Sequence, residues 1–441
     1  MKLPELLAPV GSAEHLKTAI LSGANSIYLS GEKYGARKYA ENFSLAEIRE
    51  AVIYAHLHNV KVYVTVNTLI KEGELRKVSE YLLELYKMGV DAVLIQDIGL
   101  VNIINKYIPK LKIHASTQMN IHNTEGVKWA FEHNIKRIVL AREVELEELR
   151  EIIEYAHSRD IEIEIFAHGA LCYSYSGHCL LSSFQGGRSG NRGSCAQPCR
   201  GEYELSINRT KAIHSNEGNY LLSPKDLSLY ENLDEIVNLG VDCLKIEGRM
   251  RSNDYLATVV KNYRKRLNRS RYDKTSKALE RNIHESMKKT KRGKKGKRSD
   301  FKKLQEKERI ESLKIQKREE NQKSLEELEL VFNRQFTTGH IIPKNNPMIM
   351  NRKKPGHQGL FIGTIHRYNP QTEEIHILLK DNLIHIPEKG DGIVIESEIN
   401  NKETINENKD NKTKNRNKKE KRNKRNKKNN KNKNNNNDLK Y

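Results

Sequence analysis

Eight short runs of aliphatic and β-branched residues recur along the first 260 residues, and most are separated by segments long enough for an amphipathic helix, such as Leu45–His58, Leu75–Met88 and Glu145–Ser158. Alternating units of this kind build a parallel sheet covered by helices, which predicts an α/β fold with a TIM-like (β/α) barrel. An open doubly wound sheet is the alternative, but so many successive units without a dinucleotide-binding glycine motif favour the barrel. The expected strands are Leu6–Ala8, Ser26–Leu29, Lys61–Val66, Ala92–Gln96, Lys112–Ala115, Arg137–Leu140, Glu162–Phe166 and Cys243–Ile246.

The composition changes after residue 270, which marks the expected end of the barrel domain (1–270). Residues 271–325 are rich in Lys, Arg, Glu and Gln with almost no apolar periodicity, which predicts a charged helical or disordered insertion. Short β-type runs punctuated by Gly and Pro over residues 326–399 predict a small C-terminal β-barrel domain. Residues 400–441 are nearly all Asn and Lys, and such a basic tail buries too little apolar surface to fold, so we expect it to be disordered.

The formal net charge of +21 is unevenly distributed. Residues 261–320 hold 24 Lys and Arg against 9 Asp and Glu, and residues 401–441 hold 16 against 5, so the rest of the chain carries −5. These segments fit an RNA partner, because basic residues attract phosphate whatever the base sequence. An AT-rich genome that encodes Asn/Lys tails is the alternative explanation. We find no signal-peptide pattern and no apolar run near the ~18 residues of a membrane span, and therefore expect a soluble, cytoplasmic protein.

Four of the five cysteines lie within 28 positions, in a glycine-rich stretch that follows the strand expected at Glu162–Phe166. The neighbouring glycines allow tight turns and direct N–H groups at sulfur or at a bound anion. In a cytosolic chain such a group indicates metal binding more than disulfides. Four thiolates complete either a zinc or an iron–sulfur ligand shell, although the spacing lacks the paired CxxC of a zinc ribbon, and free core cysteines are a third interpretation. The four residues are Cys172, Cys179, Cys195 and Cys199.

Polar residues at the C-terminal ends of the expected strands are the candidates for catalysis, because (β/α) barrels place their active sites there. Arg142 and Arg249 suit bidentate recognition of a dicarboxylate, and the glutamates can orient these arginines or move protons. A closed ion-pair network that stabilises the barrel is the alternative. The candidate catalytic residues are Arg142, Glu143, Glu164, His168, Lys245, Glu247 and Arg249, and the candidate substrate-binding residues are Asn67, His114, Ser116 and Gln118.

The stretch from Glu164 to Ser182 resembles the signature of the collagenase-like peptidase family U-32. Similar stretches include LLAPVGS near the start, CAQPCR at 195–200 and LKIEGRMRS at 244–252, and the resemblance covers about three quarters of the chain. The matching signature positions are Glu164, Phe166, Gly169, Ala170, Leu171, Cys172, Gly177, Cys179, Leu181 and Ser182.

The resemblance implies more than one activity. Family members are commonly named as proteases, whereas other relatives hydroxylate a pyrimidine in transfer or ribosomal RNA in a prephenate-dependent way and carry a four-iron four-sulfur cluster on cysteines. By resemblance, the four clustered cysteines would bind a 4Fe–4S cluster, and prephenate is the dicarboxylate that the two arginines would bind. Cys243 lies where many relatives have Ser or a similar small residue, and we expect it to be a core cysteine rather than a substitute ligand.

Protease chemistry has little support in the residues themselves. HExxH does not occur, and the run GGRSGN has Asn191 where GxSxG requires Gly. A cysteine nucleophile beside His168 or His178 would use a cysteine that the cluster needs. Our leading hypothesis is therefore an iron–sulfur enzyme that hydroxylates a pyrimidine base in tRNA or rRNA. A collagenase-like protease and a non-catalytic RNA-binding or assembly factor are the alternatives.

Overall fold

A computed structural model describes residues 3–207, 211–213, 218–270, 298–342 and 349–396. The basic tail expected at 400–441 and the first part of the charged insertion, 271–297, lie outside the described residues. The chain divides into two compact units between Ile386 and Pro387, and all the candidate site residues belong to the first unit.

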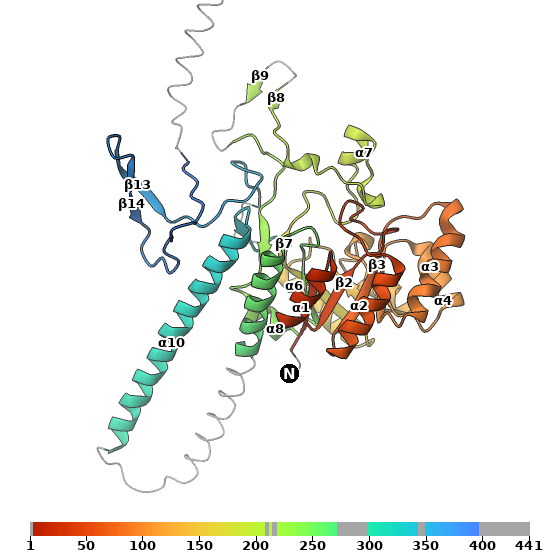
Figure 1. The fold of residues 1–441 in the computed structure, drawn as a ribbon. Helices are drawn as coiled ribbons and strands as arrows, with labels where there is room; N and C mark the ends of the chain where they lie inside the picture. The colour runs from red at the N-terminus through yellow and green to blue at the C-terminus, as the bar shows by residue number, and fades with distance from the viewer. Residues whose placement is uncertain (1–2, 208–210, 214–217, 271–297, 343–348, 397–441) are drawn as a thin grey trace, which may run out of the picture. The chain divides into compact units, whose positions relative to one another are not determined.

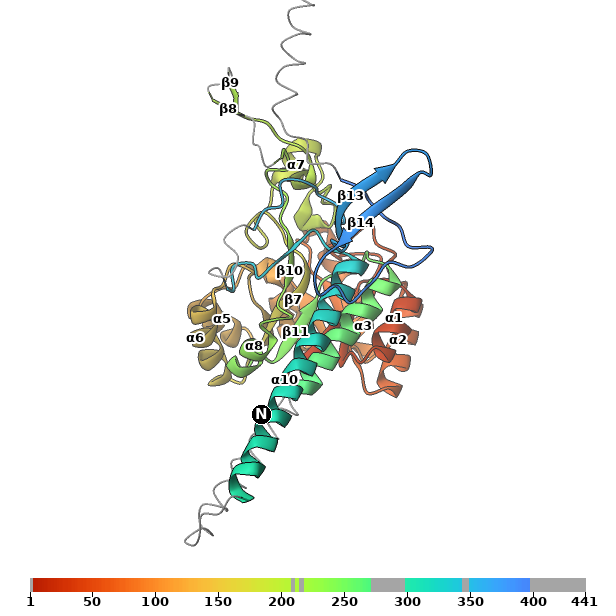
Figure 2. The same ribbon diagram turned by 90° about the vertical axis from the view of Figure 1, so that its left-hand side faces the viewer.

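Eight parallel strands close into a barrel in the first unit (Figure 1 and Figure 2). From β1 to β7 each strand pairs with the next along the chain, and β11 pairs with both β7 and β1, which closes the ring. All eight strands expected from the sequence are present, so the prediction of a TIM-like (β/α) barrel is confirmed. The strands are β1 (Glu5–Pro9), β2 (Ser26–Leu29), β3 (Lys61–Val66), β4 (Ala92–Ile95), β5 (Ile113–Ala115), β6 (Ile135–Val139), β7 (Glu162–Ala170) and β11 (Cys243–Ile246).

The side chains of these strands alternate between two apolar layers. Outward-facing residues pack beneath the helices, as Ile163 and Ile165 of β7 do. Inward-facing rings such as Tyr28, Tyr63 and Phe166 fill the barrel interior. Because successive residues of a strand point to opposite faces and both faces are buried here, the strands read as nearly continuous apolar runs in the sequence.

Several of the helices around the barrel begin at a side-chain cap, which is supplied by Ser12, Ser44, Asp97 or Asn123. Ser44 and Glu47 exchange two hydrogen bonds at the start of α2: the Glu47 N–H donates to Ser44 Oγ at 3.3 Å, and the Ser44 N–H donates to the Glu47 carboxylate at 2.7 Å. These caps satisfy N–H groups that a helix leaves unpaired at its first turn. The helices are α1 (Ala13–Leu21), α2 (Leu45–Leu57), α3 (Leu75–Lys87), α4 (Ile98–Tyr107), α5 (Thr124–Glu132), α6 (Leu146–His157) and α8 (Leu233–Leu239), and residues 253–270 are also helical.

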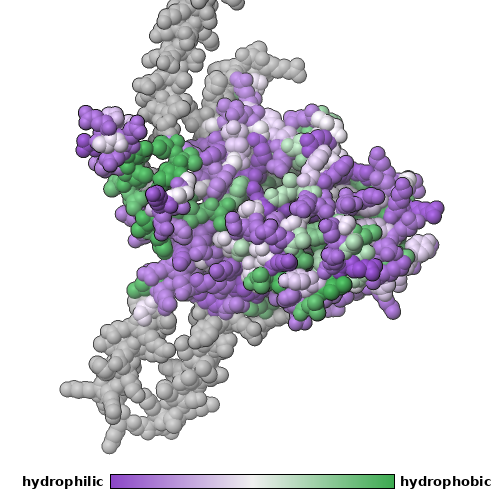
Figure 3. Space-filling model, in the orientation of Figure 1, coloured by the Kyte–Doolittle hydropathy of each residue, from purple (hydrophilic) through white to green (hydrophobic). Residues whose placement is uncertain are grey.

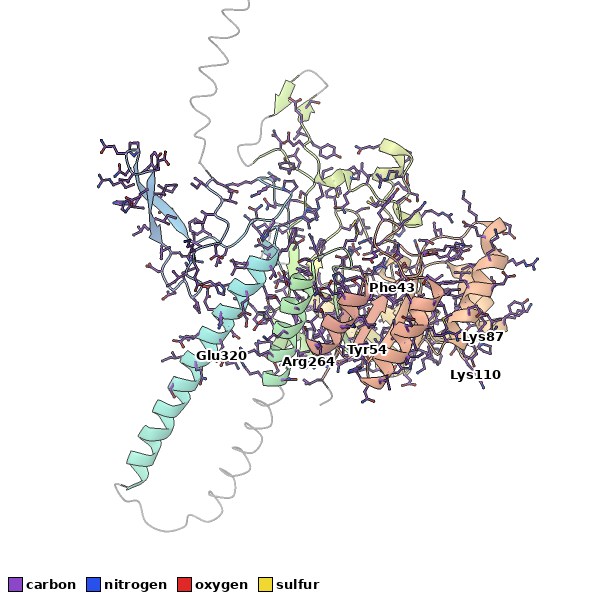
Figure 4. The ribbon with its side chains drawn as sticks, in the orientation of Figure 1. Phe43, Tyr54, Lys87, Lys110, Arg264 and Glu320 are labelled. Atoms are coloured by element: carbon purple, nitrogen blue, oxygen red, sulfur yellow. The ribbon has the colours of Figure 1, made fainter. Side chains whose placement is uncertain are left out.

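A long charged helix, α10 (Arg298–Val331), includes the second part of the expected insertion, which is therefore helical from 298 to 325. The helix over residues 253–270 lies beside it in both ribbon views (Figure 1 and Figure 2). Arg269 of that helix forms an ion pair with Glu320 of α10, whose position is labelled in Figure 4. The described part of the insertion therefore contacts a helix of the outer layer of the barrel near Glu320.

Three strands occupy the region where a small β-barrel domain was expected. β12 (Phe336–Thr337) pairs with β10 (Asp226–Ser228), and β10 runs antiparallel to the end of β7. β13 (Gly363–Asn369) and β14 (Glu374–Leu379) form an antiparallel hairpin that carries exposed apolar side chains (Figure 3). Within the described residues these strands do not close on one another, so the small β-barrel domain stays a prediction.

Candidate functional site

The cysteine loop, defined here as residues 171–200, follows β7 and lies at the C-terminal ends of the barrel strands (Figure 1). It contains the short helix α7 (Leu181–Gly186) and two 3₁₀ turns, η3 (Gly190–Arg192) and η4 (Pro198–Arg200). A hairpin of β8 (Leu205–Ile207) and β9 (Lys211–Ile213) follows it. The four cysteines therefore lie at the end of the barrel where active sites of this fold form.

Two glycines hold the loop close to the rim of the barrel. Gly177 has a φ of +78°, and a β-carbon at this position would stand only 2.1 Å from the carbonyl oxygen of Gln118. Gly193 has a φ of +74°, and its β-carbon would stand 2.4 Å from the carbonyl oxygen of Gly35. The left-handed backbone and the lack of space both require glycine at these two positions.

Polar contacts also attach the loop to the segment after β3. The Leu69 N–H donates to the carbonyl oxygen of Asn191 at 3.0 Å. Arg192 donates to both carboxylate oxygens of Glu74, at 2.7 and 2.8 Å, and to the carbonyl oxygen of Leu69 at 2.7 Å. The loop is therefore joined to the barrel rim by backbone and side-chain bonds as well as by close packing.

The four loop thiols lie within electrostatic range of one another. Burial raises the pKa of the Cys199 thiol, Arg200 opposes this rise, and negative charge on the other three loop thiols adds to it. Cys195 Sγ accepts a hydrogen bond from the Gln197 N–H at 3.3 Å. Such N–H contacts to sulfur tune iron–sulfur clusters, so the donor types and their surroundings fit a cluster.

Within the described ranges, no group of three or more His, Cys, Asp or Glu side chains is placed so that it could hold a metal ion. The loop thiols, as placed, do not form a single-ion site.

Arg37, which the sequence analysis did not single out, connects the cysteine loop with the barrel mouth. Its Nη2 donates to Glu247 Oε1 at 3.1 Å, and although burial lowers the pKa of Arg37, Glu247 and the nearby Cys195 raise it. Arg249 lies close by, is only 5% exposed and donates to Asn42 Oδ1 at 3.4 Å. Burial and the charge of Arg37 lower the pKa of Arg249 to about 10. Arg249 stays charged at neutral pH and forms no ion pair with a carboxylate of the described part of the chain.

Several buried oxygen atoms near the ends of β3, β4, β5 and β6 have no hydrogen-bond partner among the described residues. One of them belongs to Glu143, whose other oxygen accepts from the Ser176 N–H at 3.0 Å, while the Ser176 hydroxyl accepts from the Arg142 N–H at 3.2 Å. Because buried polar groups are nearly always paired, these atoms are expected to meet a ligand or water. They are Thr65 Oγ1, Gln96 Oε1, Gln118 Oε1 and Glu143 Oε2.

The expectation that Glu164 and Lys245 lie at the barrel mouth is wrong. Glu164 is fully buried inside the barrel, where it accepts from Lys245 Nζ at 2.8 Å and from Arg137 Nη1 at 3.5 Å. Arg137 also pairs with Glu5 at 2.9 Å and with Glu162 at 2.6 Å. These side chains project inward from the early positions of their strands, and they form the closed ion-pair network that the sequence left open as an alternative.

The expectation that His114 lies at the mouth is also wrong. It is 4% exposed, its ring meets the ring of Tyr63 edge-on at 4.7 Å, and it lines a cavity together with Lys61 and Arg137. His114 is in register with Arg137 of β6 and its ring contacts Tyr63, so it lies at the level of these two side chains. Its side chain therefore belongs to the N-terminal end of the barrel.

His168 faces away from the mouth because of a β-bulge. Strand alternation predicts an inward side chain, but Ala167 is an extra residue opposite β11, so that Lys245 pairs with Phe166 and Ile246 pairs with His168. Burial lowers the pKa of His168 to about 3, and its Nδ1 lies 3.4 Å from the hydroxyl of Tyr263. A proton-donor role at the mouth is therefore wrong for this neutral ring. It packs against Tyr255, Tyr263 and Phe336 on the outer side of the barrel.

Two of the expected substrate-binding residues contact backbone near the strand ends. Asn67 Oδ1 accepts from the Ala36 N–H at 3.0 Å, and Ser116 Oγ accepts from the Gln118 N–H at 3.3 Å. These bonds shape the loops that surround the mouth, and direct contact of either residue with substrate stays a prediction. The candidates that the structure brings to the mouth beside the cysteine loop are Gln118, Arg142, Glu143, Glu247 and Arg249.

The fold and the site define a (β/α)-barrel protein with a four-cysteine loop over the C-terminal end of its strands. The sequence pattern of peptidase family U32 matches residues 11–310, which is more than half of the chain. The chain belongs to peptidase family U32.

Several named proteins are similar to this chain over about 60% of its length. The chain is 40% identical over 268 residues to tRNA hydroxylation protein P1 of Bacillus subtilis, and the aligned region covers 60% of this chain and 63% of that protein. It is 40% identical over 263 residues to 23S rRNA 5-hydroxycytidine C2501 synthase of Escherichia coli, which covers 60% of this chain and 39% of that protein. It is 34% identical over 269 residues to a collagenase of Porphyromonas gingivalis, which covers 59% and 64%. The matches span less than two thirds of each of these relatives.

A solved structure of the U32 peptidase Mk0906 is similar at 15% identity and a TM-score of 0.37, over 56% of this chain and 94% of that chain. Among the helices of the described residues, none is long and apolar enough to cross a membrane.

Proposed function

We propose that this protein is an iron–sulfur enzyme that acts in the hydroxylation of a pyrimidine base in tRNA or rRNA. The observation that carries the proposal is the position of the cysteine loop over the barrel mouth. Among the described residues, a buried arginine at this mouth has no carboxylate partner, and several buried oxygens have no hydrogen-bond partner. Relatives named as tRNA and rRNA hydroxylation proteins, at 40% identity, support this class of reaction.

The four loop cysteines are the proposed ligands of a 4Fe–4S cluster, which supplies one-electron transfer when bound. The chain's own groups prepare the surroundings of these thiolates. The Gln197 N–H donates to Cys195 Sγ at 3.3 Å, and Arg37 places positive charge near the same sulfur. Hydrogen bonds and positive charge stabilise a more negative, reduced state at such a site. Zinc bound by the same thiolates is the alternative.

Arg249 is the proposed binding group for a carboxylate of a small acid such as prephenate. A guanidinium that is 5% exposed and lacks a carboxylate partner among the described residues is costly unless a ligand supplies the opposite charge. Arg142 is the second candidate, because its guanidinium lies over the Phe166 ring at 5.4 Å at the end of β6. Two arginines can recognise the two carboxylates of one dicarboxylate ligand.

Gln96, Gln118 and Glu143 are the proposed recognition groups for the pyrimidine base. Amide and carboxylate groups match the hydrogen-bonding edge of a base, and each carries a buried oxygen that needs a partner. An enzyme that modifies a ring atom of a base must take that base out of its stack, and these groups would then meet its exposed edge. A base that left these oxygens unpaired would be rejected.

The test is deletion of the gene followed by complementation and mass spectrometry of nucleosides from digested tRNA and rRNA. We expect the deletion to remove a hydroxylated pyrimidine that the wild-type gene restores. A Cys172→Ala/Cys199→Ala variant should not restore it, whereas Cys243→Ala should, because Cys243 is buried inside the barrel away from the loop.

Unchanged nucleosides in the deletion strain would contradict the proposal. Gelatin cleavage by the purified wild-type protein that the double cysteine variant loses would establish the protease alternative. Retained RNA binding with unchanged nucleosides would favour an RNA-binding or assembly factor.

A further inference from the structure

A cavity opens at the N-terminal end of the barrel, at the opposite end from the cysteine loop. Its volume is about 310 Å³, and it is lined by residues at the starts of β3 to β7, among them Lys61, Tyr63, His114 and Arg137. Ligand sites in proteins are commonly of this size. The proposed RNA chemistry makes no use of this cavity.

Two of the three carboxylates that line this cavity are already paired. Glu162 binds Arg137 at 2.6 Å. Asp91 accepts from His56 Nε2 at 2.9 Å and from a backbone N–H of β3 at 2.8 Å. Asp160 is the third carboxylate and forms no ion pair with a described residue, and a histidine, unlike a lysine or arginine, has no fixed charge that would offset Asp91. The lining therefore holds three carboxylates against four cationic side chains.

The cationic side chains outnumber these carboxylates by one in the lining of the cavity. Lys112 and Lys136 are exposed, come from the adjacent strand regions of β5 and β6, and form no ion pair within the described ranges. Lys61 also lines the cavity and pairs with Glu5 at 3.1 Å, which leaves two of its three N–H donors for another acceptor. The unpaired groups of the cavity therefore favour an anion.

His114 supplies a buried group that lacks a partner at the same cavity. Its Nδ1 has no hydrogen bond among the described residues, and the side chain is only 4% exposed. Burial and the neighbouring Arg137 keep the pKa of His114 well below its usual range, so the ring is neutral. A neutral imidazole offers one donor and one acceptor, and a buried nitrogen without a partner indicates a missing polar ligand.

We propose that this cavity is a second ligand site, which binds a small polyanion bearing phosphate or carboxylate groups. Lys112 and Lys136 attract its charged groups, and His114 forms a hydrogen bond with one of its polar atoms. Lysine ammonium groups are flexible point charges that accommodate either type of anion. The site lies at the end of the barrel away from the cysteine loop, so ligand binding here does not depend on the proposed RNA reaction.

The test is isothermal titration calorimetry of the full-length protein with sodium pyrophosphate and, in a separate arm, with sodium citrate at low salt. We expect one saturable site per chain for at least one anion, and weaker binding as salt increases. Lys112→Gln/Lys136→Gln should weaken that binding about tenfold or more. His114→Phe, which keeps a ring against Tyr63, should weaken it about fivefold. Asp160→Asn should strengthen it, because it removes the unpaired negative charge.

A Lys17→Gln/Lys77→Gln variant is the matched control, because it removes the same charge from exposed positions on α1 and α3. Its affinity should stay within about twofold of the wild type. Tighter binding of pyrophosphate assigns the site to phosphate compounds, and tighter binding of citrate assigns it to carboxylates. Three results would overturn the proposal. They are no saturable binding of either anion, an equal loss of affinity in the two double variants, or binding of an RNA oligonucleotide by a protein that binds neither small anion.

Discussion

Gly177 and Gly187 offer a matched pair of substitutions in the cysteine loop, because both have a left-handed backbone but only one contacts the barrel. Their φ angles are +78° and +65°. A β-carbon at Gly177 would stand 2.1 Å from the Gln118 carbonyl oxygen, whereas nothing lies within 4 Å of the same position at Gly187. We predict that Gly177→Ala releases the loop from the barrel rim and that Gly187→Ala leaves it attached.

Gly177→Ala disturbs contacts that Gly187→Ala leaves intact. A left-handed alanine costs about 1–2 kcal/mol at either position. At Gly177 the loop must also move by about 1 Å to reach an ordinary contact distance. That movement weakens the hydrogen bond from Asn191 Nδ2 to the Gly177 carbonyl oxygen, now 2.9 Å long, which contributes about 1 kcal/mol. With the lost packing, we expect loop opening to be easier by about 2 kcal/mol in Gly177→Ala than in Gly187→Ala, or about 30-fold.

Hydrogen exchange measured by mass spectrometry on peptides from residues 171–200 reports this opening directly. We expect exchange in the loop to be about 30-fold faster in Gly177→Ala than in Gly187→Ala, with unchanged exchange in the barrel strands. The iron content should fall in the same order. Equal loop exchange in the two variants would refute the idea that the contact between Gly177 and Gln118 holds the loop in place.

Three further predictions concern the stability of the barrel and the attachment of the loop. Arg137→Met should lower the free energy of unfolding, measured by urea titration, by about 3–5 kcal/mol, because it removes one of the partners of buried Glu164. A loss below about 1 kcal/mol would contradict the role of this ion-pair network. The pKa of His168 falls from 6.5 to about 3 on folding. As the pH is lowered from 6.5 towards 3, the imidazole is therefore protonated in the unfolded chain but not in the folded one, and the free energy of unfolding falls by about 1.4 kcal/mol per pH unit. His168→Phe should remove this part of the pH dependence, and an unchanged slope would show that the ring is not buried and neutral. Arg192→Ala should lower the free energy of global unfolding by less than about 1 kcal/mol, since its ion pair with Glu74 is partly exposed. It should nevertheless speed proteolysis of the cysteine loop, and an unchanged rate of proteolysis would contradict a role of this pair in attaching the loop.

The fold was largely predictable because the barrel strands are buried on both faces. Each strand is therefore an apolar run that stands out between amphipathic helices, and all eight runs were found. Strand ends were less certain: β7 continues to Ala170, beyond the expected Phe166, because β10 pairs with its last residues. That pairing joins distant parts of the chain, and local sequence carries no signal for it.

The depth of a side chain within the barrel was the main source of error in the site. Position in a strand indicates which residues are inward-facing, but Glu164 and His114 lie near the start of the barrel because of strand register. His168 was misplaced by the single extra residue Ala167, which reverses the alternation after it.

The residues that immediately follow strands were placed more reliably. Arg142, Glu143 and Arg249 lie at the mouth as expected, because parallel strands all end at the same rim. Arg37 was missed because it lies in a long loop after β2. Its path back to the mouth depends on the contact between Gly35 and Gly193 of the cysteine loop.

Anaerobic purification with analysis of iron, zinc and acid-labile sulfide tests most directly whether the cysteine loop holds a 4Fe–4S cluster. We predict about four iron and four sulfide per chain, with a broad absorption band near ~400 nm. Cys172→Ala/Cys199→Ala should lose this signal, and Cys243→Ala should keep it. Zinc without sulfide, or a full iron and sulfide content in the double variant, would contradict a cluster on these cysteines.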